Sequence, residues 1–114
     1  MTWVDVCALD SLVPGRGVRA LVGTSPVAVF LLDDGTLHAI DDIDPGTGAS
    51  VLSRGLTGSR TVDGDRVPTV ASPLHKERFD LRSGRCLDGD ATVATWPVRA
   101  CGDRVEVGAT PLAR

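Results

Sequence analysis

Aromatic residues are scarce in this sequence of 114 residues, and long hydrophobic runs are missing. Two tryptophans and two phenylalanines make up 4% of the chain, so the interior must consist mainly of Val, Leu, Ile and Ala. The longest apolar run, residues 27–32, is far shorter than the roughly 20 residues that a membrane-spanning helix needs. We therefore expect no membrane association.

An excess of positive charge is also missing, because 12 basic residues stand against 15 acidic ones and the formal net charge is −3. This balance excludes the basic footprint of a nucleic-acid-binding domain. The first residues contain neither a basic segment nor an apolar one, so no secretory signal is predicted. Cys7, Cys86 and Cys101 lie far apart, which argues against a disulfide framework and favours a reducing cytoplasm. We expect all three to be small buried residues.

Helical periodicity is absent over any stretch of ten residues. Short apolar segments instead recur at a spacing of about 8–12 residues between Gly, Pro and Asp turns, which predicts an all-β antiparallel sandwich or small barrel. Residues 27–32 are apolar on both sides and predict a central strand. The other predicted strands are residues 3–7, 17–22, 37–40, 68–71, 78–81, 95–100 and 104–107.

Turn residues mark the connections between these strands. Asp-Gly at residues 34–35 predicts a type I′ hairpin, because that turn needs the positive φ that these residues tolerate. A second Asp-Gly, at residues 63–64, predicts a turn inside the polar stretch 58–67. We expect one domain over residues 1–114, with a core at about 3–107 and a loose C-terminal tail.

Two loops stand out as candidate functional segments. The first, residues 41–55, is long and rich in turn formers, and Val51 and Leu52 are predicted to pack it onto the body of the domain. The second begins at Ser72-Pro73 and runs into residues 78–81, where apolar and charged residues alternate as in a half-buried strand.

The residues of these loops carry a resemblance to a known family. Three segments resemble the cluster-binding loops of Rieske-type domains and the residues beside them. They are Asp44-Pro45 with residues 48–55, residues 71–81, and Gly84-Arg85-Cys86. Among these domains, the chain looks most like one branch, the small subunits of assimilatory NAD(P)H-dependent nitrite reductases. The resemblance implies the Rieske fold of iron–sulfur proteins, a β-sandwich with two protruding loops.

A Rieske centre binds one iron through two cysteines and the other through two histidines. The resemblance places these ligands at Asp44, Gly46, Ser72 and His75, where only the histidine is retained. A serine hydroxyl is a poor substitute for thiolate, and glycine has no ligating side chain. We therefore expect a Rieske-like fold without a [2Fe–2S] cluster and without other cofactors. Pro45, Leu74 and the apolar end of the first loop are predicted to fill the space between the loop tips.

The resemblance also implies a partner, a large nitrite reductase subunit that carries FAD, sirohaem and a [4Fe–4S] cluster and reduces nitrite to ammonium. This chain would support that enzyme in nitrate assimilation without a catalytic site of its own. Arg54, His75, Lys76 and Arg78 are the candidate docking residues, because cations at the loop-bearing end would suit an acidic surface.

Four alternatives remain to be weighed on the residues alone. A Rieske ferredoxin would carry electrons, but it would need the missing ligands. A stand-alone β-domain could bind some other protein. A hydrolytic arrangement of Ser72, His75 and Asp44 or Asp80 is disfavoured, because Pro73 removes the backbone N–H that often stabilises an oxyanion. A zinc site has equally little support, since no Cys or His pair has ligand spacing.

Overall fold

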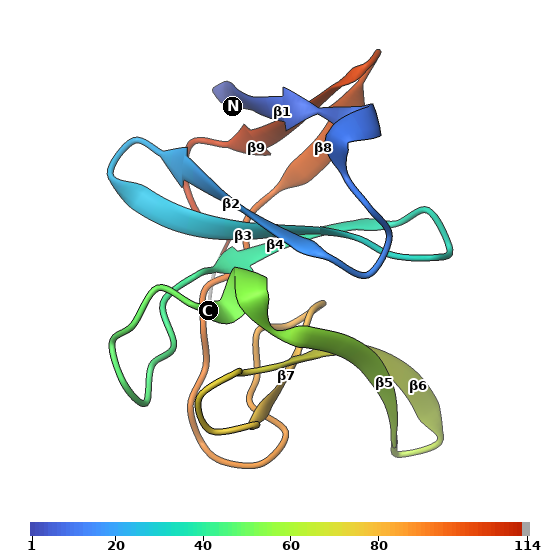
Figure 1. Cartoon of the computed structure of the whole chain (residues 1–114), viewed down its shortest axis with the longest axis vertical. Helices are drawn as coiled ribbons and strands as arrows, with labels where there is room; N and C mark the ends of the chain where they lie inside the picture. The colour runs from blue at the N-terminus through green and yellow to red at the C-terminus, as the bar shows by residue number, and fades with distance from the viewer. Residues whose placement is uncertain (113–114) are drawn as a thin grey trace.

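The computed structural model describes residues 1–112 and consists of short β-strands with two turns of 3-10 helix (Figure 1). The elements in chain order are β1 (Trp3–Ala8), η1 (Leu9–Ser11), β2 (Gly17–Val22), β3 (Ser25–Leu31), β4 (Leu37–Asp41), η2 (Leu52–Arg54), β5 (Leu56–Val62), β6 (Asp65–Ala71), β7 (Arg78–Asp80), β8 (Val98–Cys101) and β9 (Arg104–Gly108). Every paired strand is antiparallel, which confirms the predicted all-β class. Within the described residues, no helix is long and apolar enough to cross a membrane.

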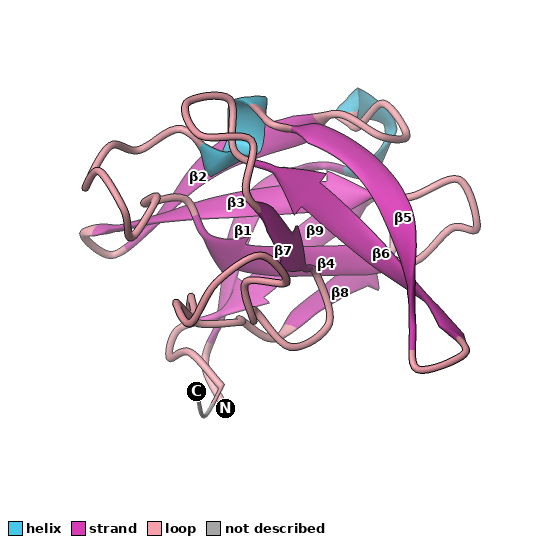
Figure 2. Ribbon diagram, turned by 90° about the horizontal axis from the view of Figure 1, so that it is seen from below, coloured by secondary structure: helices cyan, strands magenta, loops and turns pink. Residues whose placement is uncertain are grey.

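The strands form three small sheets, ordered β1-β9-β8, β2-β3-β4 and β5-β6-β7. The first sheet lies at one end of the molecule, the second across its middle and the third at the other end (Figure 1). The third sheet is inserted in the chain between β4 and β8, and β5 is one of its two edge strands (Figure 2). This arrangement brings residues 41–55 and 72–77 to the same end of the fold.

Strand β3 connects the two hydrophobic cores. Val27 and Val29 pack with Trp96 and the buried valines of β9, whereas Ala28 and Phe30 pack with Leu52 and the interior of the third sheet. Because successive side chains in a strand point to opposite faces, a strand buried on both faces must be apolar throughout. The prediction of a central strand here is confirmed, since β3 pairs with β2 on one side and β4 on the other.

The predicted hairpin at residues 33–36 forms, but its turn is not type I′. Only Gly35 has a positive φ, at +85°, because the Asp34 carboxylate accepts hydrogen bonds from the backbone N–H and the hydroxyl of Thr36, at 3.0 and 2.6 Å. These bonds hold Asp34 in an ordinary conformation. Positive φ at two consecutive residues occurs instead at Asp63 and Gly64, in the turn between β5 and β6.

Strand β5 was not predicted, because its residues are mostly polar and its partner β6 carries the apolar ones. Strand β6 also begins at Asp65, earlier than the predicted residue 68. Of the three thiols, all unpaired, Cys86 is buried as expected, but Cys7 is only half-buried and Cys101 is exposed in the β8–β9 turn region. Burial raises the pKa of the Cys86 thiol.

The predicted loose tail begins after β9. The backbone N–H of Ala109 donates to the carbonyl oxygen of Thr2, and that of Leu112 donates to the carbonyl oxygen of Thr95, at 2.8 and 2.7 Å. These bonds hold the first part of the tail against the domain. The last two residues of the predicted tail, 113–114, lie outside the described residues.

Candidate functional site

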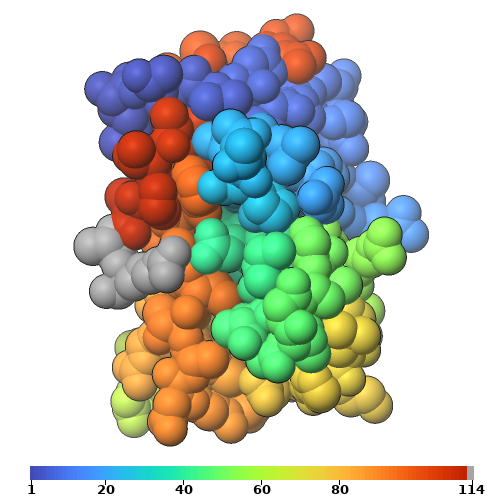
Figure 3. Space-filling model, turned by 90° about the vertical axis from the view of Figure 1, so that its left-hand side faces the viewer, coloured from blue at the N-terminus to red at the C-terminus, as the bar shows by residue number. Residues whose placement is uncertain are grey.

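The two loops meet through a buried hydrogen bond between their leading residues. The Ser72 hydroxyl donates to Oδ2 of Asp44 over 2.5 Å, and the two residues are only 1% and 2% exposed. The segments lie side by side on one face of the molecule, the first loop in green and the second in yellow (Figure 3). Hydrogen bonds to a charged acceptor are short and strong in such dry surroundings. This bond therefore closes the space between the loops.

The first loop is held by a second buried aspartate, Asp42, which is 0% exposed. Its carboxylate accepts hydrogen bonds from the backbone N–H of Ser53 and the hydroxyl of Ser50, both at 2.6 Å. Its carbonyl oxygen accepts the N–H groups of Val51 and Leu52. Arg19 lies 3.5 Å from the same carboxylate and balances its charge. Leu52 is fully buried, so the prediction that it packs the loop onto the body is confirmed.

The second loop is a tight turn stabilised by its own backbone. The N–H of Ser72 donates to the carbonyl oxygen of Glu77, and the N–H of Lys76 donates to that of Ser72, both at 2.8 Å. Lys76 adopts a positive φ of 59°, which is uncommon for a residue with a side chain. This conformation fixes the direction in which the Lys76 side chain leaves the loop.

The four positions that would bind a Rieske cluster do not fit one. Asp44 and Ser72 offer hard oxygen atoms that already bind each other, and Gly46 uses its N–H to donate to Oδ1 of Asp44 at 2.8 Å. His75 lies beside Gly46, where a Cβ atom would be 3.9 Å from the imidazole, and its ring alone cannot bind two irons. Within residues 1–112, every buried side-chain nitrogen and oxygen already has a hydrogen-bond partner.

The expectation that Pro45 and Leu74 fill this space is wrong. Pro45 is exposed and Leu74 is 51% exposed, while the Ser72–Asp44 bond occupies the region between the loops. A carboxylate and a hydroxyl at this spacing satisfy each other, so no apolar filling is required.

The same contacts argue against a hydrolytic site. Ser72 donates its hydroxyl proton to a carboxylate rather than to a histidine, and no hydrogen bond joins it to His75 in the described structure. Asp80 accepts the N–H of Arg82 and also binds no histidine. Without a histidine at the hydroxyl, Ser72 lacks the base that a Ser-His-Asp arrangement requires.

Three of the four predicted docking cations surround one groove. Arg54, Lys76 and Arg78 line a hollow of about 630 Å³ beside the second loop, whereas His75 is exposed at the loop tip and is not among its lining residues. The groove also contains Leu56, which is 81% exposed. Sequence reasoning missed Leu56, because nothing in a single leucine at the start of an unpredicted strand indicates exposure.

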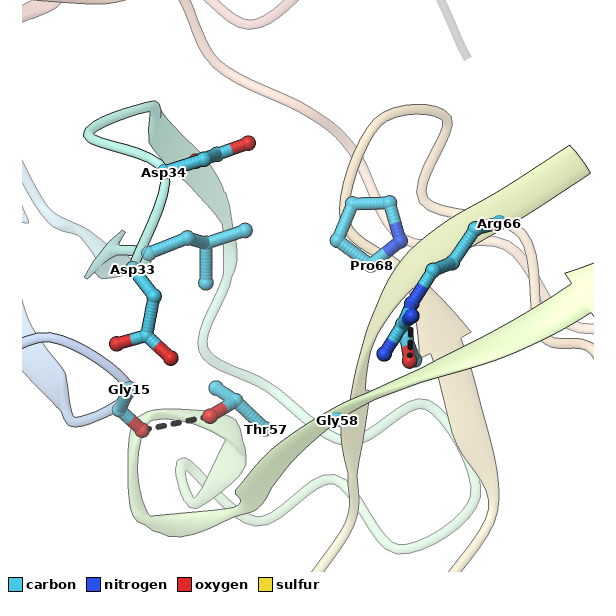
Figure 4. A pocket seen from close by; sticks show the side chains of 9 residues that line it. Gly15, Asp33, Asp34, Thr57, Gly58, Arg66 and Pro68 are labelled. Carbon is cyan, nitrogen blue, oxygen red and sulfur yellow. Dashed lines mark hydrogen bonds between the residues drawn. The ribbon is translucent and has the colours of Figure 1, made fainter.

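A second cavity, of about 510 Å³, lies between the β3–β4 hairpin and the third sheet (Figure 4). Asp33 and Asp34 lie on one side of it, with Arg66 and Pro68 on the other. Two of its polar side chains already have partners, since the Thr57 hydroxyl donates to the carbonyl oxygen of Gly15 and Arg66 donates to the Ser59 hydroxyl. Hydrogen bonds from Thr36 lower the pKa of Asp34, which remains ionised and solvated. The residues that line this cavity do not form a recognisable catalytic or metal-binding arrangement.

The fold and the two paired loops agree with the result of comparing the chain with known proteins. The family described as Rieske-like [2Fe-2S] domain matches residues 2–108. The chain belongs to this family. Within the family it belongs with the nitrite reductase small subunits, since it is 43% identical over 89 residues to the NADH-dependent small subunit of Salmonella typhimurium, covering 77% of this chain and 79% of that protein.

Solved structures of this Rieske-like family agree. A protein of Mycobacterium tuberculosis assigned as a small subunit of NADH-dependent nitrite reductase is 43% identical and has a TM-score of 0.85, over 93% of each chain. The chain is also 40% identical over 107 residues to the protein named nitrite reductase [NAD(P)H] large subunit in Klebsiella oxytoca, covering 93% of this chain but only 11% of that protein. Ferredoxin components of dioxygenases match at only 29–32% identity.

Proposed function

We propose that this chain is the non-catalytic small subunit of an assimilatory NAD(P)H-dependent nitrite reductase and that it acts by binding the large subunit. One observation carries the proposal. A homologous domain is a separate small subunit in Salmonella typhimurium and part of a protein named as a large subunit in Klebsiella oxytoca. A domain that occurs both beside and within the same enzyme is expected to be located against its catalytic portion. The partner would contain FAD, sirohaem and a [4Fe–4S] cluster, and would reduce nitrite to ammonium.

The proposal places this single domain, residues 1–114, in the cytoplasm. The three unpaired thiols support that location, because an oxidising compartment would favour their pairing. Arg54, His75, Lys76 and Arg78 remain the proposed docking residues, and no metal or cofactor is assigned to this chain.

Co-expression with the candidate large subunit tests this function. We expect the two chains to co-purify and the nitrite-dependent oxidation of NADH or NADPH to fall when the small subunit is omitted. The control is the large subunit co-expressed with a Rieske ferredoxin of similar size. Equal activity with and without this chain, together with no co-purification, would refute the proposal.

The absence of a cluster has a separate test. We expect aerobically and anaerobically purified protein to be colourless, with iron far below the two atoms per chain of a Rieske centre, because Asp44 and Ser72 offer no thiolate. Visible absorption and metal analysis measure this, with a Rieske ferredoxin prepared in parallel as the control. Stoichiometric iron with absorption that bleaches on reduction would favour an electron-carrying ferredoxin instead.

A further inference from the structure

The groove beside the second loop is formed by the outer face of the third sheet. In an antiparallel pair, directly opposed residues share a face and successive residues alternate between faces. Val70 is paired with Phe79, and both point into the hydrophobic core. The adjacent row of Leu56, Ala71 and Arg78 therefore points the other way, as does the pair of Gly58 and Thr69.

The base of the groove is formed by small side chains. Gly58 is exposed and lies opposite Thr69, and a Cβ atom at Gly58 would come no closer than 3.8 Å to another atom. The fold therefore has room for a side chain at residue 58, and the hollow exists because glycine has none. Leu56 borders it with an apolar side chain that is 81% exposed, the highest exposed fraction of any large hydrophobic residue in the described structure.

The rim of the groove is positively charged, although the chain as a whole carries a net charge of −3. Arg54, Lys76 and Arg78 line it, and no aspartate or glutamate does so. Neither Arg54 nor Lys76 forms a salt bridge within residues 1–112. The nearby carboxylate of Asp88 forms its salt bridge with the guanidinium of Arg60, at 2.9 Å. From Arg78 it accepts a hydrogen bond of the backbone N–H, and the structure of residues 1–112 shows no salt bridge to the Arg78 guanidinium.

We propose that this groove binds an acidic segment of the large subunit, with carboxylates on the cationic rim and a short apolar side chain over Gly58 beside Leu56. The inference rests on the proposed function, which supplies the partner. The inference adds to that function the position and the chemistry of the contact with the large subunit. It also places His75 outside the groove that forms the centre of this contact. A second copy of this chain is a poor occupant, because pairing two such grooves would bring their cations together.

Filling the hollow tests the steric part of the inference. Gly58→Trp places an indole in the groove at a position where the backbone has room for a side chain. Thr61→Trp is the matched control, since Thr61 lies on the same strand, is exposed and points to the opposite face. We expect Gly58→Trp to weaken binding to the large subunit by about tenfold or more and Thr61→Trp to leave it unchanged, as measured by titration calorimetry. Equal binding by both folded variants would overturn the inference.

Lys76 allows a direct test, because it is the only lysine in the sequence. A carbodiimide that joins an amine to a touching carboxylate should link Lys76 to an Asp or Glu of the large subunit in the wild-type complex. Lys76→Arg keeps the positive charge but removes the amine, so its complex with the large subunit should lose the cross-link. A complex that forms without this cross-link, or a cross-link to a second copy of the chain, would overturn the inference. Failure of the wild-type chains to associate would instead refute the proposed function.

Discussion

Replacing Asp42 with alanine is expected to lower the free energy of unfolding by about 3 kcal/mol, because buried donors lose a charged acceptor. The Asp42 carboxylate accepts the N–H of Ser53 and the hydroxyl of Ser50, both over 2.6 Å, at a position that is fully buried. An alanine cannot accept either bond, and the buried N–H of Ser53 would be left without a partner. Chemical denaturation followed by fluorescence of the tryptophans measures the loss.

Asp33→Ala is the matched control for this variant. Asp33 is an exposed aspartate in the β3–β4 turn and forms no salt bridge with another described residue, so its removal should change stability by no more than about 0.5 kcal/mol. Because Asp42 organises the loop that contains Asp44, we also expect faster amide hydrogen exchange at residues 44–53 in Asp42→Ala. Similar stabilities for the two variants would show that the Asp42 contacts contribute little.

Gly84→Ala is expected to destabilise the fold by about 2–4 kcal/mol, for two reasons that add. Gly84 has a φ of +78°, which costs an alanine about 1 kcal/mol. A Cβ atom there would also lie 2.1 Å from the carbonyl oxygen of Val93, and such overpacking costs about 1–3 kcal/mol. The backbone would have to shift, and the hydrogen bond from the Val93 N–H to the Gly84 carbonyl would be strained.

Gly64→Ala separates the two causes. Gly64 has nearly the same φ, +84°, but a Cβ atom there would meet nothing within 4 Å. It should therefore cost only the conformational part, about 1 kcal/mol. Parallel urea titrations of the two variants measure the difference, and equal losses would show that the close approach to Val93 is relieved without cost.

The strands that could be predicted are those with a strong side-chain pattern. Strand β2 has the predicted bounds, and β3 is central as its two apolar faces indicated. Strand β5 escaped prediction because an edge strand with polar residues has no alternation to detect. The turn at residues 33–36 was assigned the wrong type because the contacts of Asp34 with Thr36 outweigh the tendency of Asp-Gly to adopt positive φ at both positions.

Some features of the candidate site could also be predicted from the sequence, and others could not. The loss of the cluster ligands at Asp44, Gly46 and Ser72 is visible in the residues themselves, because only side-chain chemistry decides whether iron can be bound. The role of Asp42 was not visible, since this aspartate resembles its neighbours in a run of acidic and turn-forming residues. Asp42 differs from its neighbours because it is buried and because the Ser53 N–H and the Ser50 hydroxyl donate hydrogen bonds to its carboxylate. Neither property can be inferred from a single sequence.

The amino-acid sequence alone determined the β class, most strand positions and the lack of iron ligands, because alternation and side-chain atoms are local properties of the chain. Only the tertiary structure decided that Ser72 binds Asp44, 28 residues away, and that Leu56, Gly58 and the cations of two loops surround one groove. These contacts depend on how the third sheet, which is inserted in the chain between β4 and β8, packs against the second sheet. Residues far apart along the chain become neighbours only when the hydrophobic cores on either face of β3 bring their strands together.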